Sequence, residues 1–146
     1  MENINTERHI KRVQELLEDV CKELNLRGIF HDQSKLEDPE KEMFDSATEL
    51  KTLEYGSTEY KQALTELGPA LKHHYKCNRH HPQHFKNGIS DMTLIDLIEM
   101  FVDWKASSER HETGNIYNSI DINKDRFKMS DQLAKIFKKT AKHLGY

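Results

Sequence analysis

The stretch His31-Asp32-Gln33-Ser34-Lys35 places two potential metal ligands of different chemistry side by side, with a cation within the next helical turn. A neutral imidazole nitrogen and a carboxylate oxygen together suit a borderline or hard divalent metal that keeps an open position for water or substrate. His-Asp pairs are common, however, and a capping aspartate beside a surface histidine is the simpler interpretation. A metal site therefore needs further ligands elsewhere in the chain.

The histidines supply such ligands. The chain has 9 of them, and those from His73 to His84 are concentrated in one short stretch. His9 and His74 fall on the apolar arcs of predicted helices, where a histidine is more often a hydrogen-bonded core residue than a ligand. Residues 76–85 show no helical period and are predicted to be a loop rich in ring nitrogens.

A predicted helix over about residues 91–106 is apolar except for a narrow strip that carries Asp96, Glu99 and Asp103. If the strip faces water, the helix is a surface element with a wide apolar face. If it faces inward, the acids need a metal or a cationic partner, because an unpaired buried carboxylate is very costly. Asp96 and Asp103 are two turns apart, about 10.5 Å, so they cannot share one ion.

The remaining elements must position these groups. The apolar spacing predicts an all-α protein, a single bundle of five or more helices formed by residues 1–146 as one domain. Gly28 is expected to stop the first helix, and Gly68-Pro69 to kink or divide the third. The predicted helices cover about residues 4–25, 39–53, 57–75, 91–106 and 124–143, with a polar connector over 107–123.

The first helix has a stripe expected to face the core. Its members are apolar or weakly polar and recur with helical spacing. They are Ile10, Val13, Leu16, Leu17, Val20, Cys21 and Leu24.

Composition narrows the class of protein. Charged residues make up 32% of the chain, there are 2 cysteines, and no apolar run approaches the length needed to cross a bilayer. We expect a cytoplasmic protein with no membrane partner and no disulfide between Cys21 and Cys77; a homo-oligomer stays open. The C-terminal helix has a lysine-rich face that could attract a polyanion, but a solvated face is the simpler interpretation, so nucleic acid is not the expected partner.

One further motif fails on inspection. Asp121-x-Asn123-x-Asp125 imitates the start of a calcium-binding loop. Its sixth position is Arg126, where the sharp turn needs glycine, and its twelfth is Gln132, where a bidentate glutamate is needed. No calcium site is predicted there.

Several short motifs occur in a telling order. They are His9-Ile10-Lys11-Arg12-Val13, His31-Asp32-Gln33-Ser34-Lys35, His73-His74 and Phe101-Val102-Asp103-Trp104. This order resembles the H…HD…D pattern of the HD superfamily, which are all-helical metal-dependent phosphohydrolases; the second motif is similar to the HDxGK variant, with Ser34 in place of glycine. Over about residues 9–107, HDxSK, HHxxxNxHH and EMxxDW together resemble a small uncharacterised HD-like family of phages and bacteria.

The resemblance implies a site and a chemistry. The reaction would be hydrolysis of a phosphate ester or anhydride, with a small phosphorylated substrate, a nucleotide by resemblance alone. Lys35 would meet a phosphate, with Arg79 and Asn78 as further substrate-binding candidates and Arg12 as a weaker one, while Glu99 would take a proton or orient a ligand. The implied metal ligands are His9, His31, Asp32, His73, His74, His81 and Asp103.

The metal itself is left open. Mn, Co, Fe, Ni, Zn or Mg would each suit these ligands, with one ion or two. Two-metal members with the lysine variant usually carry another histidine between HD and the His pair, and residues 36–72 contain none. Either His80 or His81 replaces it from the loop, or the site holds one metal.

Two other functions remain compatible with the sequence. Some two-metal HD proteins are di-iron oxygenases, and the surplus of histidines permits such a site. The alternative is a non-catalytic module, either stapled by zinc or binding nucleic acid through its lysine-rich helix.

Overall fold

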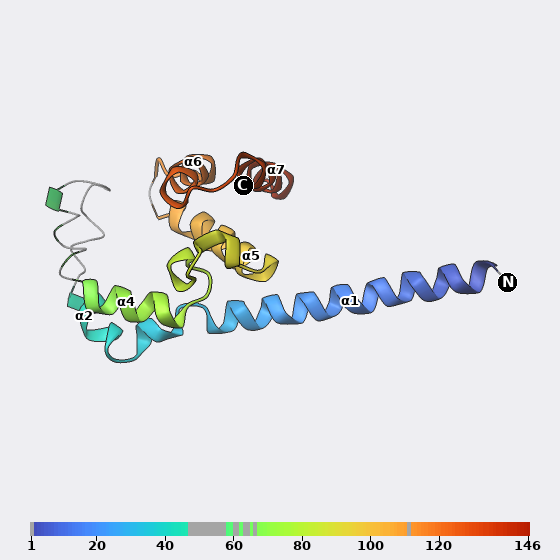
Figure 1. Cartoon of the computed structure of the whole chain (residues 1–146), viewed down its shortest axis with the longest axis horizontal. Coiled ribbons are helices and arrows are strands. Elements are labelled where there is room, and N and C mark those ends of the chain that lie inside the picture. The colour runs from blue at the N-terminus through green and yellow to red at the C-terminus, as the bar shows by residue number, and fades with distance from the viewer. Residues whose placement is uncertain (1, 47–57, 60–61, 63–64, 66, 111) are drawn as a thin grey trace. The chain divides into compact units, whose positions relative to one another are not determined.

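The structure, a computed structural model, describes residues 2–46, 58–59, 62, 65, 67–110 and 112–146 (Figure 1). Within these ranges every regular element is a helix, which confirms the all-helical prediction. The chain divides into two compact units, residues 1–31 and 32–146, so a single domain stays a prediction. No described helix is long and apolar enough to cross a membrane.

The first unit is one long helix, α1 (Glu2–Phe30). The predicted stop at Gly28 is wrong, because Gly28 lies within the helix, which ends only before Asp32 takes up a left-handed conformation with φ 56°. Ion pairs between side chains one turn apart, such as Arg12–Glu15 and Arg27–Glu23, stabilise α1.

The apolar stripe of α1 is exposed, contrary to the expectation that it faces the core. Ile10 is 52% exposed and Leu17 is 59% exposed. The physical reason is that α1 forms its unit alone, and one helix offers no second layer within that unit against which an apolar stripe could be buried.

The second unit begins with the turns and short helices that carry the HD motif. The 3-10 helix η1 (Gln33–Leu36) follows Asp32, and α2 (Glu40–Ser46) begins just after Asp38-Pro39. Helix α4 (Gly68–Cys77) has Pro69 in its first turn, where the missing N–H would have no partner in any case, and it packs against α2. The predicted continuation of α2 to residue 53 and the start of the third helix at residue 57 lie outside the described residues.

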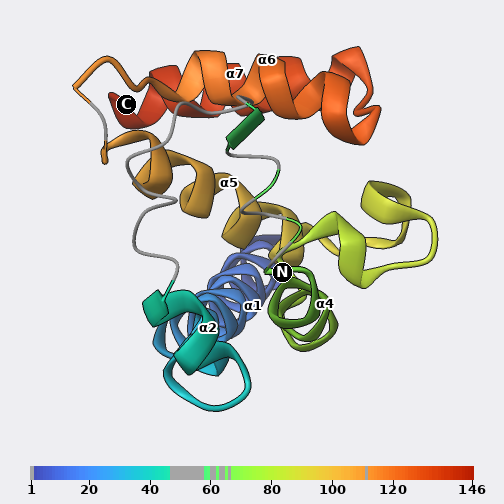
Figure 2. The ribbon, with the colours of Figure 1, turned by 90° about the vertical axis from the view of Figure 1, so that its left-hand side faces the viewer.

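Two short 3-10 helices, η3 (Pro82–His84) and η4 (Gly88–Asp91), connect α4 to α5 (Leu94–Ser108). Helix α5 is followed by α6 (Ile116–Phe127) and α7 (Asp131–Leu144). Figure 2 shows α6 and α7 running across the C-terminal half of α5, and both α5–α6 and α6–α7 are packed pairs. Their buried cluster is the core of this unit, with Met100, Phe101, Ile116, Ile120, Met129, Ala134, Phe137 and Ala141.

The predicted connector over 107–123 is wrong, because residues 116–123 belong to α6. Asn115 caps this helix by accepting a hydrogen bond from the backbone N–H of Asn118 at 2.9 Å, and Ile116 and Ile120 are buried one turn apart. The predicted helix over 124–143 is also interrupted: Lys128 is left-handed, with φ 51°, and Ser130 caps α7. Helix α6 was not predicted because its buried face is marked only by Ile116 and Ile120, among residues that are mostly polar.

The start of α5 is fixed by a buried carboxylate. Asp96 is fully buried and forms a capping box with Thr93, and it receives two hydrogen bonds from Arg79, at 3.1 and 3.0 Å. Burial alone would raise the pKa of Asp96, but the hydrogen bonds from Arg79 and Thr93 outweigh it and lower that pKa to about 2. The inward-facing interpretation of the acidic strip therefore holds for Asp96, and its partner is a cation.

We expect Asp96→Asn to lower the free energy of unfolding at pH 7 by about 2 kcal/mol, the value of a pKa lowered from 3.8 to about 2. The contribution is present above pH 4 and is lost as the pH falls toward 2, so the variant should also lose less stability on acidification. Urea unfolding at pH 7 and pH 3 measures both effects. The exposed Asp125→Asn is the control, expected within about 0.5 kcal/mol of wild type; equal effects of the two substitutions would contradict the prediction.

Candidate metal centre

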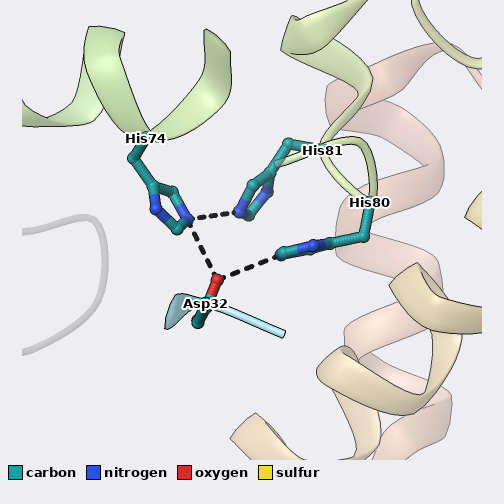
Figure 3. A group of neighbouring side chains, drawn as sticks. All are labelled: Asp32, His74, His80 and His81. Atoms are coloured by element: carbon teal, nitrogen blue, oxygen red, sulfur yellow. Dashed lines mark hydrogen bonds and ion pairs between the residues drawn. The ribbon is translucent and has the colours of Figure 1, made fainter. Parts of the chain in front are cut away.

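Four side chains converge in the second unit: Asp32, His74, His80 and His81 (Figure 3). Their nearest nitrogen and oxygen atoms all lie within 4.8 Å of one another. Oδ1 of Asp32 lies 3.3 Å from Nε2 of His74 and 3.4 Å from Nε2 of His80, and the Nε2 atoms of His74 and His81 are 2.8 Å apart. Figure 3 shows the rings of His74 and His80 facing one carboxylate oxygen of Asp32, and the ring of His81 facing that of His74.

These separations fit a metal ion well. Nitrogen and oxygen ligands bound about 2.0–2.1 Å from a tetrahedral ion lie about 3.3–3.4 Å apart. Two of the measured pairs already have that spacing, while the His74–His81 pair, which is hydrogen-bonded, would have to open by about 0.5 Å. Three imidazoles and one carboxylate form a donor set typical of zinc or another divalent transition metal.

Three segments bring the ligands together. Asp32 occupies the left-handed turn before η1, His74 lies on α4, and His80 and His81 lie in the loop between α4 and η3. The backbone N–H of Asn78 bonds to the carbonyl of His74, which ends α4, and Pro82 begins η3 directly after His81. The two loop histidines are thus held between a helix end and a proline.

Buried carboxylates orient two of the rings from behind. Nδ1 of His74 lies 2.9 Å from Oε2 of Glu40, and Nδ1 of His80 lies 3.0 Å from Oε1 of Glu99. Because an ionised carboxylate only accepts, we assign the proton of each ring to Nδ1, which leaves the lone pair of Nε2 directed at Asp32. The contact of Glu99 with His80 is one through which Glu99 could orient a ligand, the role predicted for it.

Glu40 is the centre of the supporting hydrogen bonds. It is fully buried and also accepts a hydrogen bond from Ser34 at 3.0 Å and one from Nδ1 of His73 at 2.7 Å. Burial alone would raise the pKa of Glu40, but the hydrogen bonds from His73, Ser34 and His74 outweigh it and lower that pKa. Glu40 is therefore charged, as the acceptor of the His74 proton must be.

Two of the histidine rings, those of His74 and His81, are held neutral. Burial, followed by the neighbouring His80 and His74, lowers the pKa of His81 to about 3. The pKa of His74 is also lowered, by burial and by the charge of Lys35. Neutral imidazoles are the form that binds metal, so neither ring needs to lose a proton at neutral pH before it binds an ion.

The predicted substrate-binding residues have partners within the protein. Nζ of Lys35 lies 2.6 Å from Oδ2 of Asp32, so its observed partner is a candidate ligand, and contact with a phosphate stays a prediction. Arg79 is paired with Asp96, as described above. The amide of Asn78 donates to Oγ of Ser34 at 2.8 Å and to the carbonyl of His74 at 2.9 Å, which places Asn78 behind His74 as a support.

Asp103 is near the cluster without belonging to the group of four. It lines a pocket of about 590 Å³ together with His81, and its charge acts on the His81 ring. His73 points to Glu40 and Cys77, a separate group. Asp103 and His73, which the sequence analysis places in one ligand set, therefore have different neighbours in the structure.

The N-terminal candidates belong to the other unit. His31 is its last residue and directly precedes Asp32, so its role as a ligand stays a prediction. His9 is exposed on α1, and because α1 is continuous, His9 and Phe30 lie about 30 Å apart along its axis, at 1.5 Å per residue. While α1 is unbroken, His9 and His31 of one chain are too far apart to hold the same ion, and which of the two is a ligand stays a prediction.

Sequence reasoning missed three residues at this site. No role at the site was predicted for Glu40, and Ser34 was interpreted as a substitution for glycine and His80 only as an alternative to His81. A signal for Glu40 was available, because a helix that begins next to the HD turn places its first acid beside that turn. The hydrogen bond from Ser34 to Glu40 could be found only from the folded structure.

A family model matches residues 2–144, which is nearly the whole chain; its description is Family of unknown function (DUF5662). The chain belongs to DUF5662. No curated protein and no solved structure matched the chain. The match spans all four members of the His/Asp cluster, so the DUF5662 region includes the whole candidate metal centre.

We expect Glu99→Gln to weaken binding of the metal by about 10- to 100-fold, the usual loss when a supporting carboxylate is removed. A neutral amide can offer its own N–H to His80, which would move the proton of the ring to Nε2, the atom that faces Asp32. Competition with a chromophoric chelator, using Zn²⁺ or Co²⁺, measures the affinity. Glu109→Gln, at the exposed end of the same helix, should bind as wild type does; an unchanged affinity in Glu99→Gln would contradict the assignment.

Proposed function

We propose that this member of DUF5662 is a metal-dependent phosphohydrolase whose ion is held by Asp32, His74, His80 and His81. The observation that supports this most directly is that the His/Asp cluster adjoins a pocket: His81 belongs to both. Structural zinc sites are closed, whereas a catalytic ion keeps a position open to water or substrate. With four protein ligands, the ion would need five or more ligands in all to bind water, and the adjoining pocket would supply the space for it.

The chemistry of the pocket wall favours an anionic substrate. Arg110 and Arg126 line it, and the guanidinium of Arg126 lies 4.8 Å from the centre of the Phe127 ring, which limits its orientation. Guanidinium groups bind phosphate through paired hydrogen bonds. Further hydrogen-bonding side chains surround them, namely Tyr75, Gln83, Ser107, Thr113, Asn115, Asn118, Ser119 and Asn123.

The parts of the site then divide the work. A divalent ion, when bound, would supply a water of lowered pKa and polarise a phosphoryl oxygen. Arg126 and Arg110 would hold the phosphate, and Asp103 on the pocket wall would orient the attacking water. Glu40 and Glu99 would keep His74 and His80 in place, and Lys35 would hold Asp32 through its second oxygen. A nucleotide is the substrate class that the HD resemblance implies.

The proposal is tested by metal loading followed by a substrate screen. Protein stripped with a chelator and reloaded with Mn²⁺, Co²⁺, Ni²⁺ or Zn²⁺ should release phosphate from a nucleotide or another phosphate ester. His80→Ala should lose one bound ion in mass spectrometry of the undenatured protein, and the turnover with it. The exposed His143→Ala on α7 should keep both. Full binding in His80→Ala, or no hydrolysis by any loaded form, would contradict the proposal, and oxygen consumption by the iron-loaded protein would favour the oxygenase.

Arg126→Ala separates substrate binding from metal binding. If Arg126 holds a phosphate, the variant should keep its ion and its helical content and lose about 10²-fold in kcat/KM, the loss typical of one charge-stabilising group. Lys139→Ala, which removes an exposed cation on α7, should change kcat/KM little. The steady-state rate of phosphate release measures both variants. Equal kinetics for Arg126→Ala and wild type would remove this pocket from the substrate site.

A further inference from the structure

A second group of metal-ligating side chains lies on the other side of Glu40. It consists of Glu40, His73 and Cys77, which offer an oxygen, a nitrogen and a sulfur atom within 4.8 Å of one another. His73 and Cys77 are four residues apart on α4, so one helix face presents both, as in helical metal-binding pairs. None of the three is a member of the Asp32 cluster.

The distances suit an ion with a thiolate ligand. Sγ of Cys77 lies 3.8 Å from Nδ1 of His73, and that nitrogen lies 2.7 Å from Oε1 of Glu40. With a metal–sulfur bond of about 2.3 Å and a metal–nitrogen bond of about 2.0–2.1 Å, tetrahedral ligands would be about 3.6 Å apart. The carboxylate–imidazole pair would have to widen to about 3.3 Å. The side chain of His73 is 39% exposed, which leaves it room to move.

We propose that Glu40, His73 and Cys77 form a second, solvent-accessible site for a thiophilic divalent ion, with zinc the best match to this donor set. The ion takes the place of the proton that His73 Nδ1 shares with Glu40. That proton moves to Nε2 of the neutral ring, and the thiol of Cys77 loses its own, so binding releases one proton to solvent and changes no oxidation state. Water completes the coordination, because Cys77 is exposed.

The two oxygens of Glu40 keep the sites distinct while joining them. Oε2 faces Ser34 and His74 of the buried cluster, and Oε1 faces His73. The second site thus uses an oxygen that the first does not, and its occupancy does not depend on the proposed phosphohydrolase activity. A carboxylate already oriented by Ser34 and His74 is a ready ligand for the outer ion.

Cobalt titration tests this site, because only a thiolate ligand gives an intense sulfur-to-cobalt charge-transfer band in the near ultraviolet. The stripped full-length chain titrated with Co²⁺ should develop this band. Cys77→Ser should abolish it and lower the number of bound ions by one, with the circular dichroism spectrum unchanged. Cys21→Ser, which removes the exposed cysteine of α1, is the matched control and should behave as wild type.

Three outcomes would overturn the proposal. They are the absence of the band in the wild type, its survival in Cys77→Ser, and its loss in Cys21→Ser. His73→Ala should also abolish the band while Cys77 remains, which distinguishes a His-Cys site from a lone reactive thiol. Asp32→Asn should keep the band while losing the buried ion, so failure of the phosphohydrolase proposal and failure of this one give different results.

Discussion

The arrangement of the second unit depends on one buried charge, the carboxylate of Glu40. A carboxylate removed from water is very costly unless hydrogen bonds and charges compensate it. Here Ser34, His73 and His74 supply that compensation, and they come from η1 and α4, while Glu40 itself begins α2. Satisfying this single group therefore fixes three segments relative to one another. The same contact sets the tautomer of His74, so the requirement of folding and the preparation of a metal ligand coincide.

The same principle acts again on α5. Asp96 and Glu99, one turn apart, are both buried, and each takes its partner from consecutive residues of the loop after α4: Arg79 binds Asp96, and His80 faces Glu99. These two contacts hold two consecutive residues of the loop, Arg79 and His80, against α5. His81, the next residue, is then directed toward His74, and the Nε2 atoms of the two rings lie 2.8 Å apart. Its position is a consequence of how its neighbours are held, and its lowered pKa follows from that burial.

Features marked by local sequence patterns could be predicted, whereas contacts between residues far apart in the chain could not. Wide apolar stripes predicted α5 and the all-helical class, and the order of His31-Asp32, His73-His74 and the loop histidines indicated a metal site. Helix α6 was missed because only Ile116 and Ile120 mark its buried face among polar residues. Glu40 and Ser34 were missed because the α4 partners that place them at the site, His74 for Glu40 and Asn78 for Ser34, are 34 and 44 residues away along the chain. Such pairings depend on the packing of α2 and η1 against α4. Local patterns report which residues can act, while burial decides which of them meet.

Asp32 shows why an ion would matter to the fold as well as to chemistry. Its backbone is left-handed, a conformation that costs an ordinary residue about 1 kcal/mol or more, and its carboxylate is shared between Lys35 on one side and two imidazoles on the other. Neutral rings return little of that cost, since an imidazole without a proton at Nε2 cannot donate to Oδ1. A cation among these atoms would be attracted to the carboxylate and to each lone pair at once. The four ligands come from the turn at Asp32, from α4 and from the loop that follows it, so the ion would link these three segments. The free energy of binding would then offset the cost of the left-handed conformation at Asp32.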